Sequence, residues 1–523
     1  MGASFSWPYR HSRQQNIFAV HSYGIAMRNK RGSVMNQNSL LIKGGDVLAA
    51  DGTLRRADVL VREGCIEEVA PNIEVSDVNV IDASGKMISP GLINSHYHSN
   101  ENFNPGLYEG LPLDLWFVHS HQVTRTAPMS AEAIYTRTLL GAVAMLRSGT
   151  TAVVDFVFEA PEITAATLEP IIRAYRDVGL RATVLLGAAD LHYLSSLDID
   201  SADRGAASTE FTPPTVDRII GVAREAVQEW HEPEGMIGIG LGPSAPQRCS
   251  LALLTATMEM ARQEGLVWQT HVQETRTQAV TARRWQHRSF IDLLSQAKLL
   301  GPEATLVHTV WIDDDDRALM AASGTSAVHC PYSNLRLGDG IANLPALLRA
   351  GVNVGLGTDG RGCDETLDML ELIRLTGLLH KVHGLPPEDW LTAHQAFAMA
   401  TSAGSRCAGH GDALGRIEPG ARADIVLLRK DTLTFTPLHN PLRQLVFGAT
   451  SRDVHSVIVD GRVVVDGGEV VGVDIPRLLA DASRYAADDV LSTDTNTERL
   501  EGAVRRMFDG AEAAEHHVNA YIG

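Results

Sequence analysis

The middle of the chain alternates short apolar runs with helix-length amphipathic stretches. Eight runs rich in Val, Ile and Leu recur: residues 87–94, 150–156, 181–187, 236–242, 266–271, 304–308, 326–330 and 352–359. Near-continuous apolar strands that alternate with helices are typical of a parallel sheet covered on both faces. Eight such units predict an α/β fold, a (β/α)8 TIM barrel, whose active site lies at the carboxyl ends of the strands.

Short alternating strands flank this region on both sides. Turns containing Gly and Asp-Gly separate them, which is typical of a small antiparallel sheet, and Asp460-Gly461 predicts a hairpin. We expect the two flanks to pair into one small β domain. The expected division is 1–38, a disordered basic extension; 39–86, the N-terminal segment of the β domain; 87–413, the barrel; 414–473, the C-terminal segment of the β domain; and 474–523, a C-terminal helical tail.

Charge and composition exclude several classes of partner. The formal net charge of -18 opposes nucleic acid or an anionic membrane surface as the main partner. No apolar run approaches the length of a membrane-spanning helix. The five cysteines are scattered without a CxxC pair, which indicates a reducing compartment. We therefore expect a cytoplasmic protein that acts on a small-molecule substrate, and the sequence leaves a homo-oligomer open.

The first 38 residues differ in charge from the rest. They contain no acidic residue and five basic ones: Arg10, Arg13, Arg28, Lys30 and Arg31. A targeting segment is one interpretation, and MGASFS fits a myristoylation pattern. A disordered extension explains the same features and is the interpretation that we favour, because the segment lacks the apolar run of a secretion signal.

Histidines and a carboxylate follow the expected strands where the strands end. The stretch GLINSHYHSNENF places His96 and His98 one residue apart, so that both can face one ion from the same side of a strand. His271, His308 and Asp359 end three other expected strands, which a barrel brings to the same rim. A structural role is the usual explanation for a single buried histidine, but it does not explain five converging groups. The pattern therefore predicts a site for Zn²⁺ or another borderline divalent ion.

Three segments with similar lettering are interpreted as structural. His119 and His121 repeat the HxH spacing, but in an expected helix, where the two side chains diverge. His516 and His517 lie in a polar tail, and GIGLG at 238–242 reads as a barrel strand without a nucleotide-binding fingerprint.

Several motifs together resemble one known family. PGLINSHYH, LPLDLW, THVQET, LVHTVW, HCPYSNLRLGDGIANLPALLRAGVNVGLGTDG and LGRIEPGARADIVLL occur in collinear order between about residue 39 and about residue 467. They resemble the amidohydrolase superfamily, and within it the atrazine/triazine hydrolase and deaminase (ATZ/TRZ) subgroup. The resemblance implies a (β/α)8 barrel with a β-sandwich built from both flanks.

The resemblance also implies a single metal ion and a pair of proton-handling side chains. The metal-binding positions correspond here to His96, His98, His271 and Asp359. Glu274, His308 and Asp359 are the expected catalytic residues. A divalent metal lowers the pKa of bound water towards ~7. Glu274 can then carry a proton to the leaving group, His308 can polarise the substrate, and Asp359 can orient the attacking oxygen. Zn²⁺ is the default ion, although Fe²⁺ and Mn²⁺ share its ligand preferences here.

The lysine positions favour one metal ion over two. Related hydrolases with two metals often bridge them with a carbamylated lysine on the fourth strand. This chain has no lysine between Lys86 and Lys298, so its fourth strand cannot supply one.

The substrate pocket departs from the nucleoside deaminases of the subgroup. PSAPQRC replaces a pattern similar to PHAPYTC, and TDGRGCDE replaces one similar to TDGAASNN. These changes argue against an adenosine-like substrate and favour a polar, donor-rich one, such as an aminated heterocycle, an amidine or a urea. The expected substrate-binding residues are Asn100, Trp116, Gln247, Arg248 and Asp364, and a core role for Trp116 is an equal alternative.

Three functions follow from these observations. The leading one is a metal-dependent aminohydrolase, or deaminase, that displaces an amino group from an aminated N-heterocycle. The second uses the same metal site on an amide, urea or carbamate C–N bond, or on a C–Cl bond of a triazine-like ring. The third is a non-enzymatic scaffold, which the complete set of expected ligands opposes.

Overall fold

The structure is a computed structural model that describes residues 39–120, 129–160, 162–206, 212–382, 384–488 and 495–514. The basic segment 1–38 lies outside these residues, as do His121, His516 and His517. Within the described part of the chain, no helix is long and apolar enough to cross a membrane.

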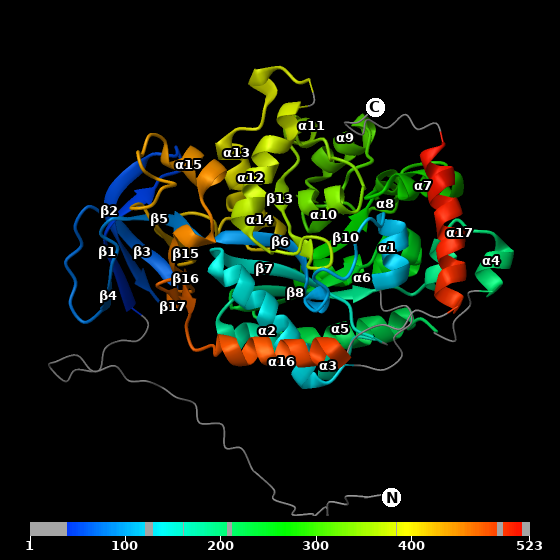
Figure 1. The fold of residues 1–523 in the computed structure, drawn as a ribbon, viewed down its shortest axis with the longest axis horizontal. Helices are drawn as coiled ribbons and strands as arrows, with labels where there is room; N and C mark the ends of the chain where they lie inside the picture. The colour runs from blue at the N-terminus through cyan, green and yellow to red at the C-terminus, as the bar shows by residue number, and fades with distance from the viewer. Residues whose placement is uncertain are drawn as a thin grey trace, which may run out of the picture.

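A closed parallel barrel forms the larger part of the molecule (Figure 1). Its strands are β6 (Leu92–His98), β7 (Thr150–Val157), β8 (Arg181–Ala188), β9 (Ile237–Pro243), β10 (Trp268–Val272), β11 (Ala304–His308), β12 (Ser326–His329) and β13 (Val354–Leu356). The short strand β14 (Asp359–Gly360) follows β13 along the chain and pairs with β6, which closes the sheet. The (β/α)8 architecture predicted from the alternating runs is confirmed.

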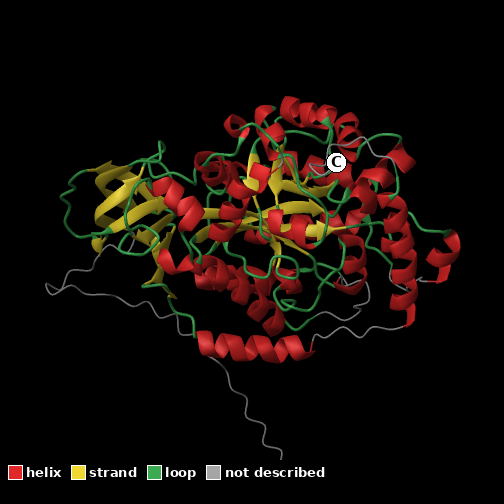
Figure 2. Cartoon of the chain, turned by 45° about the horizontal axis from the view of Figure 1, so that its top comes forward, coloured by secondary structure: helices red, strands yellow, loops and turns green. Residues whose placement is uncertain are grey.

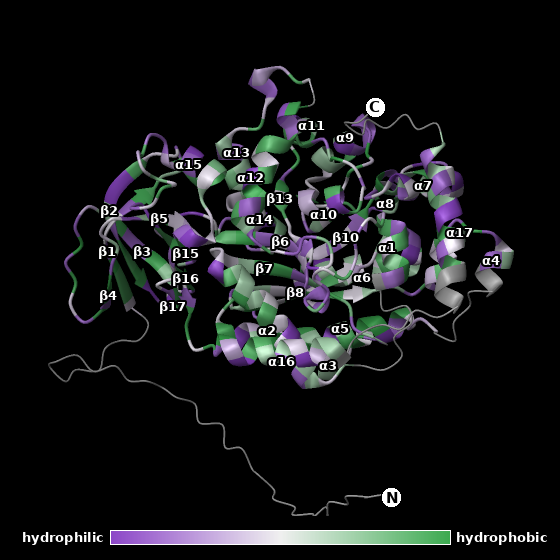
Figure 3. Cartoon of the chain, viewed as in Figure 1, coloured by the Kyte–Doolittle hydropathy of each residue, from purple (hydrophilic) through white to green (hydrophobic). Residues whose placement is uncertain are grey.

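Helices surround the barrel, as the red ribbons around the yellow strands show in Figure 2. They are α2 (Ala131–Arg147), α3 (Ala165–Val178), α5 (Val216–Trp230), α6 (Leu251–Glu264), α7 (Arg276–Gln286), α8 (Phe290–Gln296), α9 (Asp314–Ser323), α10 (Pro331–Arg336), α11 (Leu344–Arg349), α12 (Met369–Leu379), α13 (Ala393–Met399) and α14 (Ser402–Cys407). Many begin at a Ser or Thr whose hydroxyl accepts a backbone N–H of the first turn, as Thr275 does at α7. The apolar strands, such as β7 in Figure 3, are buried beneath these helices.

The two flanks form one small β-sandwich domain beside the barrel. Its strands are β1 (Ser39–Leu48), β2 (Leu54–Arg62), β3 (Cys65–Ala70), β4 (Asn79–Asp82), β5 (Lys86–Pro90), β15 (Ile425–Arg429), β16 (Val454–Val459), β17 (Arg462–Asp466) and β18 (Glu469–Val470), with α15 (Pro441–Gly448) between β15 and β16. Antiparallel pairing of β5 with β15 joins the two flanks, and Ile42, Val59 and Ile425 share their core. Asp460 and Gly461 have φ values of 52° and 75°, which suits the predicted tight hairpin between β16 and β17.

The first expected barrel strand, residues 87–94, is divided between the two domains. Residues up to Pro90 belong to β5 of the small sheet, and β6 begins at Leu92. Gly91 lies at the break, where a Cβ atom would come within 2.1 Å of the Thr151 hydroxyl oxygen. The chain therefore changes sheets at a position that only glycine fits, a change that apolar patterning does not reveal.

The C-terminal helices pack against the barrel at two places (Figure 1). α16 (Ile475–Asp488) packs on α2, and α17 (Thr495–Glu512) packs on α1 (Leu113–Ser120), α4 (Ser201–Ala206) and α7. Leu115 and Val118 of α1 share an apolar cluster with Leu500 and Val504 of α17. The last helix therefore supports α1 from outside the barrel.

Candidate active site

The expected metal-binding side chains meet at the carboxyl ends of the barrel strands. Ligand atoms of His96, His98 and His271 all lie within 4.8 Å of one another, and so do those of His96, His308 and Asp359. Asp359 Oδ1 lies 3.2 Å from His98 Nε2 and 3.6 Å from His96 Nε2. Three histidines and one carboxylate can hold a divalent ion of the zinc type.

Oxygen acceptors fix the orientation of the three imidazoles. Each Nδ1 atom lies 2.6 Å from an acceptor. The acceptors are Gln269 Oε1 for His96, the Phe156 carbonyl for His98 and the Ser244 carbonyl for His271. Because a carbonyl oxygen can only accept, Nδ1–H donates and the lone pair remains on Nε2. This pattern is typical of metal-binding histidines, whose outer nitrogen donates to an oxygen.

The charge states of His96, His271 and Asp359 also suit a metal ion. Burial lowers the pKa of His96 to about 4 and that of His271 well below its usual value, so both imidazoles are neutral near pH 7. Burial opposes a charge on Asp359, but the adjacent His96 and His98 rings hold the pKa of that carboxyl well below its usual range. The buried Nε2 of His96 has no hydrogen-bond partner among the described residues. Neutral nitrogen ligands and one carboxylate are the donor set that zinc prefers.

Glu274 and His308 form a separate pair beside these ligands. Glu274 Oε1 lies 3.3 Å from His308 Nε2, and His308 Nδ1 lies 2.9 Å from Asn334 Oδ1. Burial, together with the Asp359 charge, raises the pKa of Glu274 well above its usual value. Burial lowers the pKa of His308, which favours the neutral ring. A carboxyl group with a raised pKa can exchange protons near neutral pH, as a general acid or base must.

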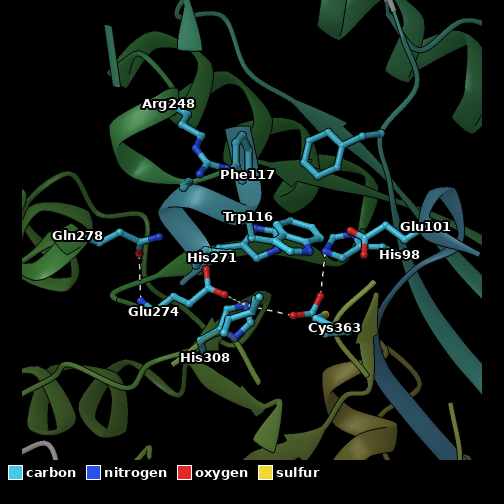
Figure 4. Close-up of a pocket in the computed structure, with 15 residues that line it drawn as sticks. His98, Glu101, Trp116, Phe117, Arg248, His271, Glu274, Gln278, His308 and Cys363 are labelled. Carbon is cyan, nitrogen blue, oxygen red and sulfur yellow. Dashed lines mark hydrogen bonds and ion pairs between the residues drawn. The ribbon is translucent and has the colours of Figure 1, made fainter. Parts of the chain in front are cut away.

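A pocket opens onto these groups (Figure 4). Helix α1 contributes Leu113, Trp116 and Phe117 to its wall. Its other lining residues are His98, Glu101, Phe158, Ala245, Arg248, His271, Glu274, Gln278, His308, Leu337, Asp359 and Cys363. Apolar side chains and converging polar groups share this wall, as they do in small-molecule sites.

The expected substrate-binding residues separate into two groups. Trp116 and Arg248 line the pocket, whereas Asn100, Gln247 and Asp364 are not among the lining residues. The Asn100 side chain accepts the Phe158 N–H at 3.3 Å, and Asp364 accepts the Thr366 hydroxyl at 3.1 Å. The substrate contacts of all five residues stay predictions.

Several lining residues were missed by sequence reasoning. Glu101 lies in the short helix η1 (Ser99–Glu101), directly after the expected ligand His98, and burial raises the pKa of its carboxyl to about 7. Its position three residues after the HxH pair was the available signal. Phe158 lies in the loop after β7, and Gln278 lies in the first turn of α7. Neither position follows a sequence pattern that points to the pocket.

The chain matches curated relatives over nearly their whole length. A 5'-deoxyadenosine deaminase of Methanothermobacter thermautotrophicus is 32% identical over 456 residues, which are 87% of this chain and 99% of the relative. A 5-methylthioadenosine/S-adenosylhomocysteine deaminase of Thermococcus onnurineus is 34% identical over 428 residues, 82% of this chain and 94% of the relative.

Solved structures show the same fold. An atrazine chlorohydrolase from Arthrobacter aurescens complexed with zinc has a TM-score of 0.78 at 26% identity, over 86% of this chain and 100% of that one. An adenosine deaminase from Xanthomonas campestris with bound zinc has a TM-score of 0.76 at 27% identity, over 86% of this chain and 98% of that one. Residues 87–464 match the model of the Amidohydrolase family. The chain belongs to the amidohydrolase family and is an enzyme of that family's carbon–nitrogen hydrolase type.

Proposed function

We propose that the chain is a zinc-dependent aminohydrolase that replaces an amino group of an aminated N-heterocycle with an oxygen. The observation that carries this proposal is the Glu274–His308 pair at 3.3 Å beside converging histidine and carboxylate donors. The names of the relatives, which are deaminases, support the reaction type. The free cysteines support a reducing, cytoplasmic location as part of the same proposal.

In this proposal, His96, His98, His271 and Asp359 hold the metal ion. A divalent ion supplies Lewis acidity that makes water a stronger nucleophile near neutral pH. The chain itself contributes the fixed Nε2 lone pairs, because each Nδ1–H is already bound to an oxygen acceptor.

Glu274 moves the proton that the reaction requires. The water oxygen bonds to the ring carbon that carries the amino group, the C–N bond breaks, and ammonia leaves with a proton. Glu274 accepts this proton from the water and delivers it to the departing nitrogen. His308 Nε2 lies 3.3 Å from Glu274 Oε1, so its ring can orient the carboxyl group or the substrate.

Hydrolysis of a different bond is the second candidate. The likeness to the atrazine chlorohydrolase, whose name indicates another leaving group, supports this candidate. The same donor set would then act on a C–Cl bond, or on an amide, urea or carbamate C–N bond. Chloride release without ammonia release would favour this candidate.

The test is metal analysis of the purified protein together with ammonia release from aminated purines, pyrimidines, pterins and triazines. We expect about one zinc per chain and ammonia from at least one ring class. Metal without ammonia from any ring would reject the aminohydrolase and favour the second candidate. A protein that binds no divalent metal would reject both.

A further inference from the structure

Arg248 is a pocket-lining cation with a fixed orientation. It ends the short helix η4 (Pro246–Arg248), which follows β9. Its guanidinium carbon lies 3.8 Å from the centre of the Phe117 ring, and Phe117 stacks on Tyr193 with ring centres 5.0 Å apart. Figure 4 shows the guanidinium beside Phe117 on the pocket wall. Stacking on an aromatic face holds the planar donor group in place.

The fold leaves this guanidinium without a carboxylate partner. Arg137 pairs with Glu159 and Arg181 with Asp424, and both arginines are fully buried. Arg248 forms no ion pair within 4.0 Å with any residue that the structure describes. Its Nε is shielded from solvent without a hydrogen-bond partner. Burial accordingly lowers the pKa of Arg248. Two carboxylates act on this guanidinium only from beyond contact distance, and a shielded donor that meets no acceptor is costly unless a ligand supplies one.

The guanidinium also lies close to the metal-binding groups. Its Nη1 lies 3.5 Å from the Ser244 hydroxyl, at the outer limit of a hydrogen bond. The carbonyl of the same Ser244 accepts from His271 Nδ1 at 2.6 Å. Ser244 therefore contacts both Arg248 and the expected metal ligand His271. Arg248 and His271 line the same pocket, so a substrate ring at the metal-binding groups can present an atom of the ring, or one attached to it, to Arg248.

We propose that Arg248 determines the substrate class: its guanidinium donates hydrogen bonds to an oxygen carried by the substrate ring, so that the preferred substrate is an amino-oxo N-heterocycle. This proposal rests on the proposed aminohydrolase function and names its substrate. A ring oxygen next to a ring nitrogen offers two acceptors in one plane, which matches the planar fork of a guanidinium. An aminated ring without an oxo group, such as adenine, lacks the stronger oxygen acceptor.

The test measures binding separately from turnover. The zinc-loaded Glu274→Gln protein, which should bind without reacting, is titrated with guanine, pterin and isocytosine as amino-oxo rings and with adenosine as an amino ring. S-adenosylhomocysteine tests a carboxylate on a long substituent. We expect the amino-oxo rings to bind more tightly than adenosine. Adding Arg248→Met should weaken their binding by roughly ten- to a hundredfold, with little effect on adenosine. Adding Arg248→Lys should restore only some of this loss, because an ammonium lacks the planar fork.

Arg276 offers a matched control. Its guanidinium also lies over an aromatic ring, 5.7 Å from that of Trp311, but it pairs with Glu512 at 3.4 Å and is not among the pocket-lining residues. Arg276→Met should leave the preference among rings unchanged. Circular dichroism and melting curves would show whether each variant folds.

The outcomes separate this proposal from the proposed function. Equal weakening of all ligands by Arg248→Met would overturn the proposal in favour of a general structural role. Weakening confined to S-adenosylhomocysteine would also overturn it, because the partner would then be a distant carboxylate. An Arg248-dependent preference for amino-oxo rings without ammonia release by the wild type would support the recognition role and reject the proposed reaction.

Discussion

Glu274 Oε1 and His308 Nε2 lie 3.3 Å apart, although the two residues come from different strand ends, after β10 and at the end of β11. Parallel pairing of these strands aligns Val272 with His308 and brings the two ends together. The backbone of His308 has a φ of 70°, an uncommon value for a residue other than glycine. Such outliers concentrate at functional sites, where the surrounding structure compensates for the strain.

Replacing Glu274 with glutamine should remove the proton carrier and leave the metal site intact. We expect kcat to fall by roughly 10²- to 10⁴-fold, which is the usual contribution of a general acid or base. Zinc content should stay at the wild-type value, because Glu274 is not among the expected ligands. Steady-state kinetics and elemental analysis measure both quantities. Glu162→Gln, at a surface ion pair with Arg218, is a suitable control. Unchanged kcat in Glu274→Gln would remove Glu274 from the mechanism.

Removal of the metal should lower both activity and stability. Three imidazoles and Asp359 would then face one another without a shared ion. The ion binds the folded state and not the unfolded state, so its removal takes away a stabilising contribution. At a zinc concentration one hundred times its Kd, that binding contributes about 2.7 kcal/mol. Calorimetry of chelated and zinc-restored protein measures the difference. A melting temperature that does not depend on zinc would contradict this expectation.

Arg181 should be a major contributor to the contact between the two domains. Its buried guanidinium donates to both carboxylate oxygens of Asp424, at 3.0 and 3.1 Å, and lies 3.0 Å from Asp460 of the small domain. Arg181→Met would leave the buried Asp424 carboxylate without its ion-pair partner, so the free energy of unfolding should fall by about 3–5 kcal/mol. Denaturant unfolding measures this loss. Arg176→Met, at an exposed pair with Glu232, should cost no more than about 1 kcal/mol.

His410 should make stability fall in mild acid. Burial, followed by the charge of Arg181, lowers the pKa of His410 to about 4 from a usual value of 6.5. Below pH 6.5 the unfolded chain therefore binds a proton that the folded chain does not. The free energy of unfolding should decrease as the pH falls from 6.5 towards about 4. His410→Asn should show a shallower decrease over this interval in parallel denaturation series, and identical slopes would exclude the contribution.

The site could be predicted from sequence where it depends on strand ends. His96 and His98 lie at the end of β6, Asp359 pairs with that end from β14, and a parallel barrel brings strand ends together whatever the loops do. Pocket residues on loops follow no such rule. Asn100 and Asp364 stand at promising positions, but their side chains are engaged by the Phe158 N–H and the Thr366 hydroxyl, local contacts that no periodicity reveals.

The domain boundary was also beyond the reach of apolar patterning. Residues on both sides of Gly91 are equally apolar and equally buried. The change from one sheet to the other depends on steric contact between Gly91 and Thr151, which is a property of the packed structure.

The support of α1 by α17 has a consequence for the order of folding. Trp116 and Phe117 line the pocket on one face of α1, while Leu115 and Val118 pack on α17 with the other. These contacts join the early and late regions of the chain, and pairings of such long sequence separation form slowly. The barrel and its histidines can therefore assemble before the substrate wall is braced. Affinity for metal should appear earlier in refolding than affinity for substrate.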